Sequence, residues 1–173
     1  SFQKLVAYKQ KHGDCFVPRN WEDSQLASWV TAQRSRARNL EATKFKRLDE
    51  LGFVWDPHKE LWEIEFQKLV AYKEEYGDCL VPDKWQEDKK FSSWVGTQRG
   101  LKRKGMLSAS KTKRLEDIGF VWDLLQHEWE IQFQAIIAYK EEHGNCLIPQ
   151  RWSNNKKLAN WVGNQRQFKR KGI

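Results

Sequence analysis

The chain has 173 residues and a formal net charge of +8, and 39% of its residues are hydrophobic, ten of them tryptophans. This apolar content can build a core, which excludes a disordered chain. Apolar runs are far shorter than the roughly 20 residues that span a bilayer, and the start has no signal-peptide core. We therefore expect an intracellular protein without membrane contact. Its net positive charge favours an anionic partner.

The chain repeats itself with a period of about 65 residues. Residues 2–21, 66–85 and 133–152 align without a gap, each beginning with Phe-Gln and ending at a Trp. Such a period indicates a tandem array of small supersecondary units. We predict an all-α fold of three-helix bundles: repeat 1 (residues 1–56), repeat 2 (57–123) and repeat 3 (124–173). Repeat 3 stops before its third helix, so we interpret the chain as a piece of a longer protein.

In chain order, each repeat opens with a long amphipathic helix. Asp56 and Asp123 are N-cap residues, and Pro57 suits the first helical position, where its missing N–H costs nothing. The expected helix ends at the glycine in each repeat that can adopt a left-handed conformation, namely Gly13, Gly77 and Gly144. An extended loop through Cys and Pro follows and leads to a Trp.

The second helix is predicted to start at a capping Asp or Asn, and the third to end at a glycine. Three residues separate each cap, Asp23, Asp88 or Asn155, from the first apolar residue of a Trp-Val stripe. The third helix, in repeats 1 and 2, closes at Gly before the segment Phe-Val-Trp-Asp at 53–56 and 120–123. This segment is expected to return Phe and Trp to the core.

The three cysteines are predicted to be free thiols. Cys15, Cys79 and Cys146 occupy the same position in the three repeats. One cysteine in each repeat does not suit a disulfide framework, so a reducing compartment is the natural setting.

Positive charge gathers on the second helix and the turn after it. Residues 89–115 contain nine Lys or Arg and no acid, residues 156–171 contain six, and residues 24–40 contain three. Two arginines lie four residues apart in each second helix and so form a basic ridge on it. Such a ridge can neutralise the phosphates of a nucleic-acid backbone. The alternative is a solvated face whose cations complement the helix dipole.

We predict that these cations contact nucleic acid. The candidate residues are Arg34, Arg36, Arg38, Lys89, Lys90, Arg99, Lys102, Arg103, Lys104, Lys111, Arg166, Lys169, Arg170 and Lys171. The Trp-Val stripe of the second helices also holds Gln33, Gln98 and Gln165. These glutamines either form hydrogen bonds with a loop backbone or read a base edge.

The tryptophans are interpreted chiefly as packing residues. Those of the second helix have core spacing, whereas the loop tryptophans can be more exposed and could stack on bases. The residues in question are Trp29, Trp94 and Trp161 in the helices and Trp21, Trp85 and Trp152 in the loops.

Nothing in the sequence points to catalysis. No set of Ser, His and Asp or pair of carboxylates recurs among the repeats. The string Gly-Leu-Lys-Arg-Lys-Gly at 100–105 lacks the Lys-Ser or Lys-Thr of a phosphate loop. His12 and Cys15 supply too few ligands for zinc. We expect no enzyme activity, cofactor, metal or small-molecule substrate.

The ordered motifs resemble those of the helicase-associated domain. They are Trp-x3-Phe-x2-Leu/Ile-x2-Tyr, His/Tyr-Gly-x-Cys-x-Val/Ile-Pro, Trp-Val-x2-Gln-Arg and Arg-Leu-x2-Leu/Ile-Gly-Phe-x-Trp. The resemblance covers essentially the whole chain and implies three-helix modules that bind nucleic acid. It carries that role onto Trp29, Gln33 and Arg34 and their equivalents in the other repeats. No motor motif is present, so it implies no helicase activity for this chain.

These observations predict a non-catalytic, monomeric tandem module that binds DNA in preference to RNA. The alternative is a protein-interaction scaffold whose basic ridges dock acidic partners.

Overall fold

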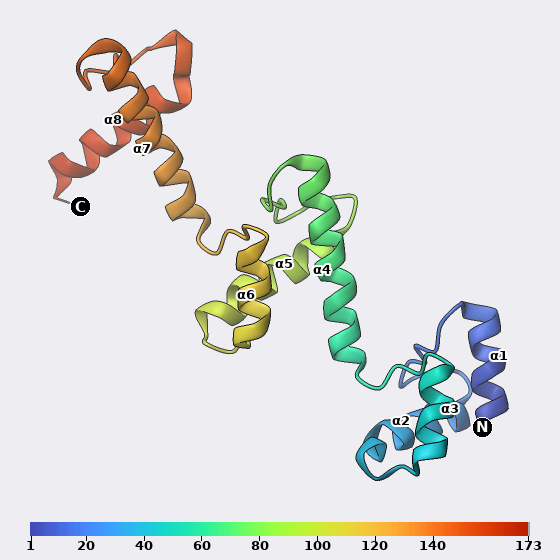
Figure 1. The fold of residues 1–173 in the computed structure, drawn as a ribbon. Helices are drawn as coiled ribbons and strands as arrows, with labels where there is room; N and C mark the ends of the chain where they lie inside the picture. Colours follow the sequence, from blue (N-terminus) through green and yellow to red (C-terminus); the bar gives the residue numbers. More distant parts are fainter. Residues whose placement is uncertain (173) are drawn as a thin grey trace. The chain divides into compact units, whose positions relative to one another are not determined.

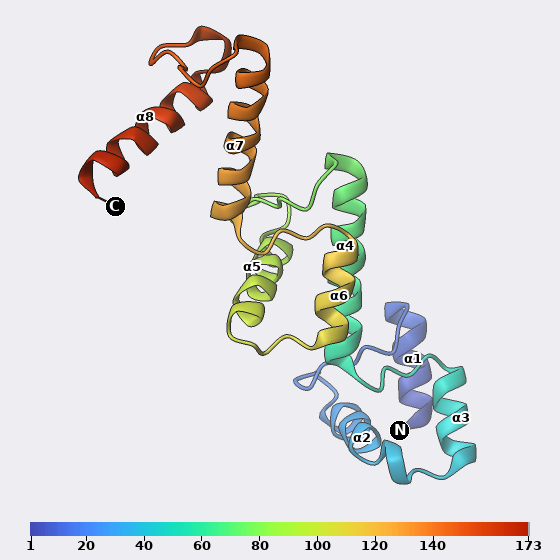
Figure 2. The ribbon, with the colours of Figure 1, turned by 60° about the vertical axis from the view of Figure 1, so that its left-hand side comes forward.

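The structure is a computed structural model that describes residues 1–172, and in this range the chain forms α-helices and no β-strand (Figures 1 and 2). The helices are α1 (Phe2–His12), α2 (Ser24–Ser35), α3 (Ala42–Glu50), α4 (Pro57–Tyr76), α5 (Lys89–Arg103), α6 (Ala109–Asp117), α7 (Leu124–His143) and α8 (Lys156–Lys171). Two short 3-10 helices, η1 (Ala37–Asn39) and η2 (Ser153–Asn155), complete the set. The predicted all-α class is confirmed.

The helices recur in the predicted order. Repeat 1 contains α1 to α3 and repeat 2 contains α4 to α6, whereas the described part of repeat 3 contains α7 and α8. Packing divides the chain into two compact units within α4, between Ala71 and Tyr72.

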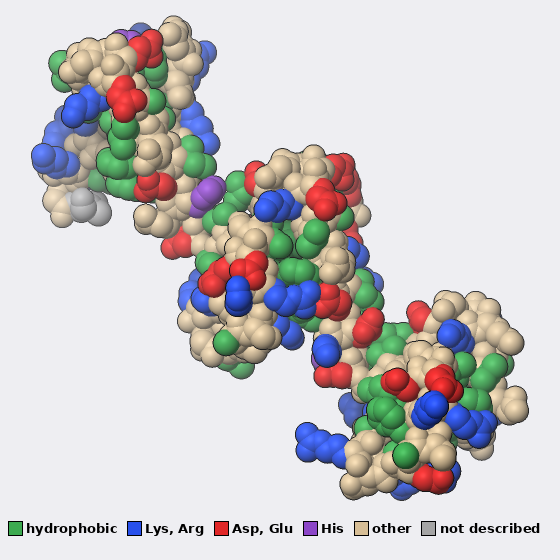
Figure 3. Space-filling model, viewed as in Figure 1, with side chains coloured by type: hydrophobic (Ala, Val, Ile, Leu, Met, Phe, Trp, Pro, Cys, Tyr) green, Lys and Arg blue, Asp and Glu red, His purple; other side chains and the backbone are tan. Residues whose placement is uncertain are grey.

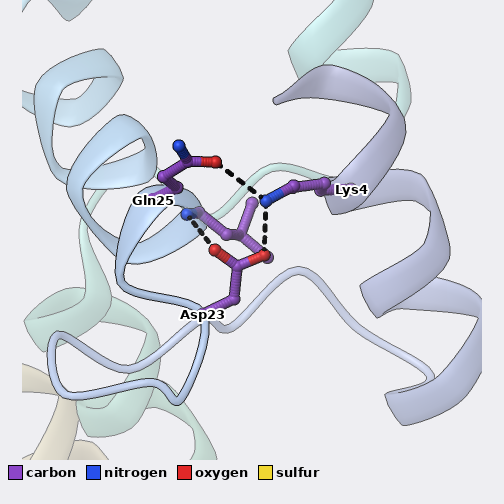
Figure 4. Close-up of polar contacts among 4 residues, drawn as sticks. Lys4, Asp23 and Gln25 are labelled. Carbon is purple, nitrogen blue, oxygen red and sulfur yellow. Dashed lines mark hydrogen bonds and ion pairs between the residues drawn. The ribbon is translucent and has the colours of Figure 1, made fainter.

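Side-chain caps start the second helix of every repeat as predicted. Asp23 Oδ1 accepts a hydrogen bond from the backbone N–H of Leu26 at 3.0 Å, and Asp88 and Asn155 cap α5 and α8 in the same way. In repeat 1 the cap also ties two helices together, because Lys4 Nζ of α1 donates to Asp23 Oδ2 at 2.8 Å and to Gln25 Oε1 at 3.1 Å (Figure 4). Each cap satisfies a backbone donor that the helix leaves unpaired.

The first helices also begin and end where predicted. Asp56 Oδ1 accepts from the backbone N–H of His58 and of Lys59 at the start of α4. At the end of α7, Gly144 has a φ of 73°, a conformation that side chains with a Cβ rarely adopt.

The core of repeat 1 is built from all three helices. Leu5 of α1, Val30 of α2 and Leu48 of α3 are buried in one cluster, to which the loop contributes Cys15. A backbone bridge joins Cys15 to Phe53 after α3. The Phe-Val-Trp-Asp segment thus returns to the core of its own repeat, as expected, and Phe53 is buried there.

In the second compact unit, α7 and α8 pack against each other without a third helix among the described residues. Their core contains Tyr139, Ile148, Leu158 and Val162. Cys79 of repeat 2 is buried, whereas Cys146 at the same position of repeat 3 is exposed. The cysteine position therefore faces solvent in repeat 3, although it is buried in repeats 1 and 2.

Candidate nucleic-acid interface

The two arginines of each pair have different surroundings, and in repeat 1 the second of them, Arg38, lies in η1 beyond the end of α2 and not in the second helix as expected. The first, in the Gln-Arg pair, turns back onto the backbone of its own repeat: Arg34 Nε donates to the carbonyl of Val54 at 2.8 Å, and Arg99 Nε donates to the carbonyl of Val121 at 3.0 Å. These carbonyls belong to the Phe-Val-Trp-Asp segments. The first arginine therefore fastens the second helix to the segment that follows the third helix.

Aromatic rings and burial reinforce this anchoring role. The guanidinium carbon of Arg34 lies 5.7 Å from the ring centroid of Phe53, and that of Arg99 lies 5.2 Å from that of Phe120. Burial lowers the pKa of both guanidinium groups, and Nη2 of each is shielded from solvent. Both side chains are half-buried, and the structure gives them an anchoring role; their contact with nucleic acid stays a prediction.

Repeat 3 has a weaker version of the same anchor. Arg166 Nη1 donates to the carbonyl of Ile148 at 3.4 Å, and the side chain is otherwise exposed. Arg34 makes the equivalent bond in repeat 1, where its Nη1 donates to the carbonyl of Val17 at 3.4 Å. Repeat 3 therefore keeps the bond to the loop before the second helix, and its described part contains no Phe-Val-Trp-Asp segment to which Arg166 could also bind.

The three glutamines do not form a shared reading surface. Gln98 is 2% exposed, and its Nε2 donates to the carbonyl of Trp94 at 3.3 Å. A side chain buried to this extent is not open to a base edge. Its bond to the backbone lies within α5 itself, whereas the favoured interpretation expected a bond to a loop. Gln33 and Gln165 are half-buried.

The second arginine of each pair points to solvent in all three repeats. Arg38 in η1, Arg103 at the end of α5 and Arg170 near the end of α8 are exposed. Within residues 1–172, none of the three has a carboxylate partner. We call Arg38, Arg103 and Arg170 the outward arginines.

Further exposed cations lie on or beside the second helices. They are Arg36 in repeat 1, Lys89, Lys90, Lys102 and Lys104 in repeat 2, and Lys169 and Lys171 in repeat 3. Lys89 and Lys90, however, are at the start of α5, about 20 Å from Arg103 at its end. Lys102 is partly engaged, because its Nζ lies 3.2 Å from Glu116 Oε1 and 5.2 Å from the ring centroid of Trp122. Lys111 is half-buried. Figure 3 shows Lys and Arg side chains gathered around the C-terminal end of α8.

The tryptophans belong to packed aromatic clusters. Trp21 meets Tyr8 edge to face with ring centroids 5.0 Å apart, and Trp152 meets Tyr139 in the same way at 4.9 Å. Trp161 of α8 contacts Trp129 of α7. All the loop and second-helix tryptophans are half-buried, which agrees with the packing interpretation.

Among the residues that the structure describes, there is neither a candidate metal site nor a candidate membrane-spanning helix. No three His, Cys, Asp or Glu side chains gather there in an arrangement that could hold a metal ion. Likewise, none of its helices combines the length and apolar character needed to cross a bilayer.

Fold and surface together define a tandem array of small helical modules with cations at the ends of the second helices. The sequence profile of the helicase associated domain matches residues 1–56, 59–123 and 126–172. The chain belongs to this family, whose domains are accessory, non-catalytic modules. Neither the curated proteins nor the solved structures contain a significant match to the chain.

Proposed function

We propose that this chain is a non-catalytic module that binds nucleic acid, DNA in preference to RNA, through the outward arginines and the cations around them. One observation carries the proposal: Arg38, Arg103 and Arg170 are exposed in three separate repeats, while the arginine four residues earlier is held by backbone carbonyls. Arg170 Nε also donates to the carbonyl of Arg166 at 3.4 Å, but its side chain stays exposed. A purely structural role would not leave the second arginine exposed in all three repeats.

Two features favour contact with phosphate, rather than compensation of the helix dipole alone, as the role of these cations. The dipole acts within the last helical turn, where Arg103 and Arg170 lie, yet Arg38 is exposed beyond the end of α2. Each neutralised phosphate also releases counterions, which makes a row of unpaired cations effective on DNA. Three weak sites on short linkers gain further affinity when one ligand engages them together.

Charge reversal at one outward arginine per repeat tests the proposal. The triple variant Arg38→Glu/Arg103→Glu/Arg170→Glu should bind duplex DNA more weakly whatever its sequence. Because each phosphate contact contributes about 0.9 to the slope of log K against log salt, the slope should fall by about 3. Fluorescence anisotropy across a salt series measures both quantities.

The matched control reverses the same number of charges on the first helices. Lys11, Lys59 and Lys140 are exposed, one in each repeat, and belong to the first helices α1, α4 and α7. The variant Lys11→Glu/Lys59→Glu/Lys140→Glu should keep most of the salt slope. Equal losses in the two variants would mean that net charge alone governs binding. Failure of the wild-type chain to bind duplex DNA at low salt would refute the proposal and favour an acidic protein partner.

A further inference from the structure

One face of α8 carries a line of amide side chains. Asn160, Asn164, Gln167 and Lys171 follow one another at intervals of four, three and four residues, which places them on one stripe of the helix. All four are exposed, and the stripe lies opposite the buried Leu158 and Val162. Among the described residues, no hydrogen bond engages the three amides, so their donors and acceptors are free.

The stripe borders a hollow rather than a convex surface. A hollow of about 680 Å³ is lined by Asn160, Asn164 and Gln167, together with Gln150, Arg170 and Lys171. The outward arginine of repeat 3 therefore shares this surface with the amides. In Figures 1 and 2 the C-terminal half of α8 diverges from α7, and Asn164, Gln167 and Arg170 are exposed.

Repeats 1 and 2 carry short side chains where repeat 3 carries the three amides. The equivalent residues are Ser28, Ala32 and Ser35 on α2 and Ser93, Thr97 and Gly100 on α5. Two of their hydroxyl groups are already engaged: Thr97 Oγ1 donates to the carbonyl of Ser93 at 2.8 Å, and Ser35 Oγ donates to the carbonyl of Thr31 at 3.1 Å. These faces can lie close to a phosphate backbone, but their side chains do not project far from the helix.

Amides on an exposed helix suit the base edges of DNA. The major groove of B-form DNA admits an α-helix, and Asn or Gln pairs in bidentate fashion with N6 and N7 of adenine. At 1.5 Å per residue, the stripe from Asn160 to Lys171 is about 16 Å long, enough to pass several base pairs. Cations at its end can meet the flanking phosphates.

We propose that α8 is a base-reading helix that enters the major groove of duplex DNA and contacts adenine through Asn164 and Gln167. Repeat 3 then supplies sequence preference, and repeats 1 and 2 supply phosphate contacts. This inference rests on the proposed function and adds to it a duplex target containing adenine. Duplex RNA does not fit, because its major groove is too deep and narrow for side chains to read.

Selection from a random duplex DNA pool tests the inference with the full chain. We expect an enriched site that contains adenine and is bound about tenfold or more tightly than a scrambled duplex. Replacement of the two amides in Asn164→Ala/Gln167→Ala should reduce this preference about tenfold or more while leaving affinity for the scrambled duplex unchanged. Alanine favours helix, so the fold should persist; circular dichroism checks this.

The control Ser93→Ala/Thr97→Ala, at the equivalent positions of repeat 2, should keep the preference. The inference is overturned if no sequence is enriched, if the amide variant retains the preference, or if duplex RNA of the selected sequence binds equally well. In those cases sequence-independent binding to duplex DNA would leave the proposed function intact. Loss of all DNA binding by the wild-type chain would instead refute the proposed function as well.

Discussion

Arg99 and Arg103 lie four residues apart in α5. We predict that replacing Arg99 lowers stability, whereas replacing Arg103 weakens DNA binding. Arg99→Ala should destabilise repeat 2, because it removes the hydrogen bond to the carbonyl of Val121 and the contact with the ring of Phe120. A hydrogen bond to a charged group contributes about 1.5–3 kcal/mol, and a cation–π contact about 0.5–1 kcal/mol. Part of this gain is offset in the native chain, because Arg99 Nη2 is buried without an acceptor among the described residues. We expect a net loss of about 2 kcal/mol in the free energy of unfolding.

Arg103→Ala should change the free energy of unfolding by less than about 0.5 kcal/mol, as is usual for an exposed site, and should weaken DNA binding. Urea denaturation followed by tryptophan fluorescence measures the first effect, and anisotropy with a labelled duplex measures the second. Binding is compared at a temperature where both variants are folded. If Arg99→Ala kept full stability and lost DNA binding, Arg99 would be a contact residue and its assignment as an anchor would be refuted.

Two further predictions concern the thiols and a helix cap. Burial raises the pKa of the Cys15 and Cys79 thiols, so a thiol reagent should modify only the exposed Cys146 in the native protein, as mass spectrometry can show; rapid modification of all three would contradict the buried placement. Hydrogen bonds from Lys4 and from the backbone lower the pKa of the Asp23 carboxyl. Because that pKa is lower in the folded state, the stabilisation is complete above the ordinary pKa near 4 and is lost as pH falls through the folded value. The stability advantage of the wild type over Asp23→Asn, measured by denaturation at several pH values, should therefore shrink below about pH 4; an advantage that does not depend on pH would exclude the ion pair as its source.

Much of the fold could be predicted because its determinants are local. A cap such as Asp88 and the backbone N–H of Phe91 that donates to it lie within one helical turn, and a stop such as Gly144 acts through its own φ. The helix order followed from these signals and from the repeat.

The different roles of the two arginines in each pair could not be predicted in this way. The partner of Arg34 is a carbonyl 20 residues along the chain, which reaches the second helix only once the third helix has folded back. The recurrence of Gln-Arg together with Phe-Val-Trp-Asp was a sign of such a pairing, but spacing alone does not show which polar groups meet. The amides of α8 were missed for a different reason: they occur in one repeat only, and the search for a site followed what the repeats share.

The boundary between the two compact units lies inside α4, which continues through it without interruption for 20 residues. A helix that serves two units couples their folding, since unwinding on one side of the boundary removes hydrogen-bond partners on the other. In a linear array, such coupling between neighbours raises the cooperativity of the whole. A ligand that binds one unit should therefore also slow local opening, and with it hydrogen exchange, in the part of α4 that belongs to the other unit.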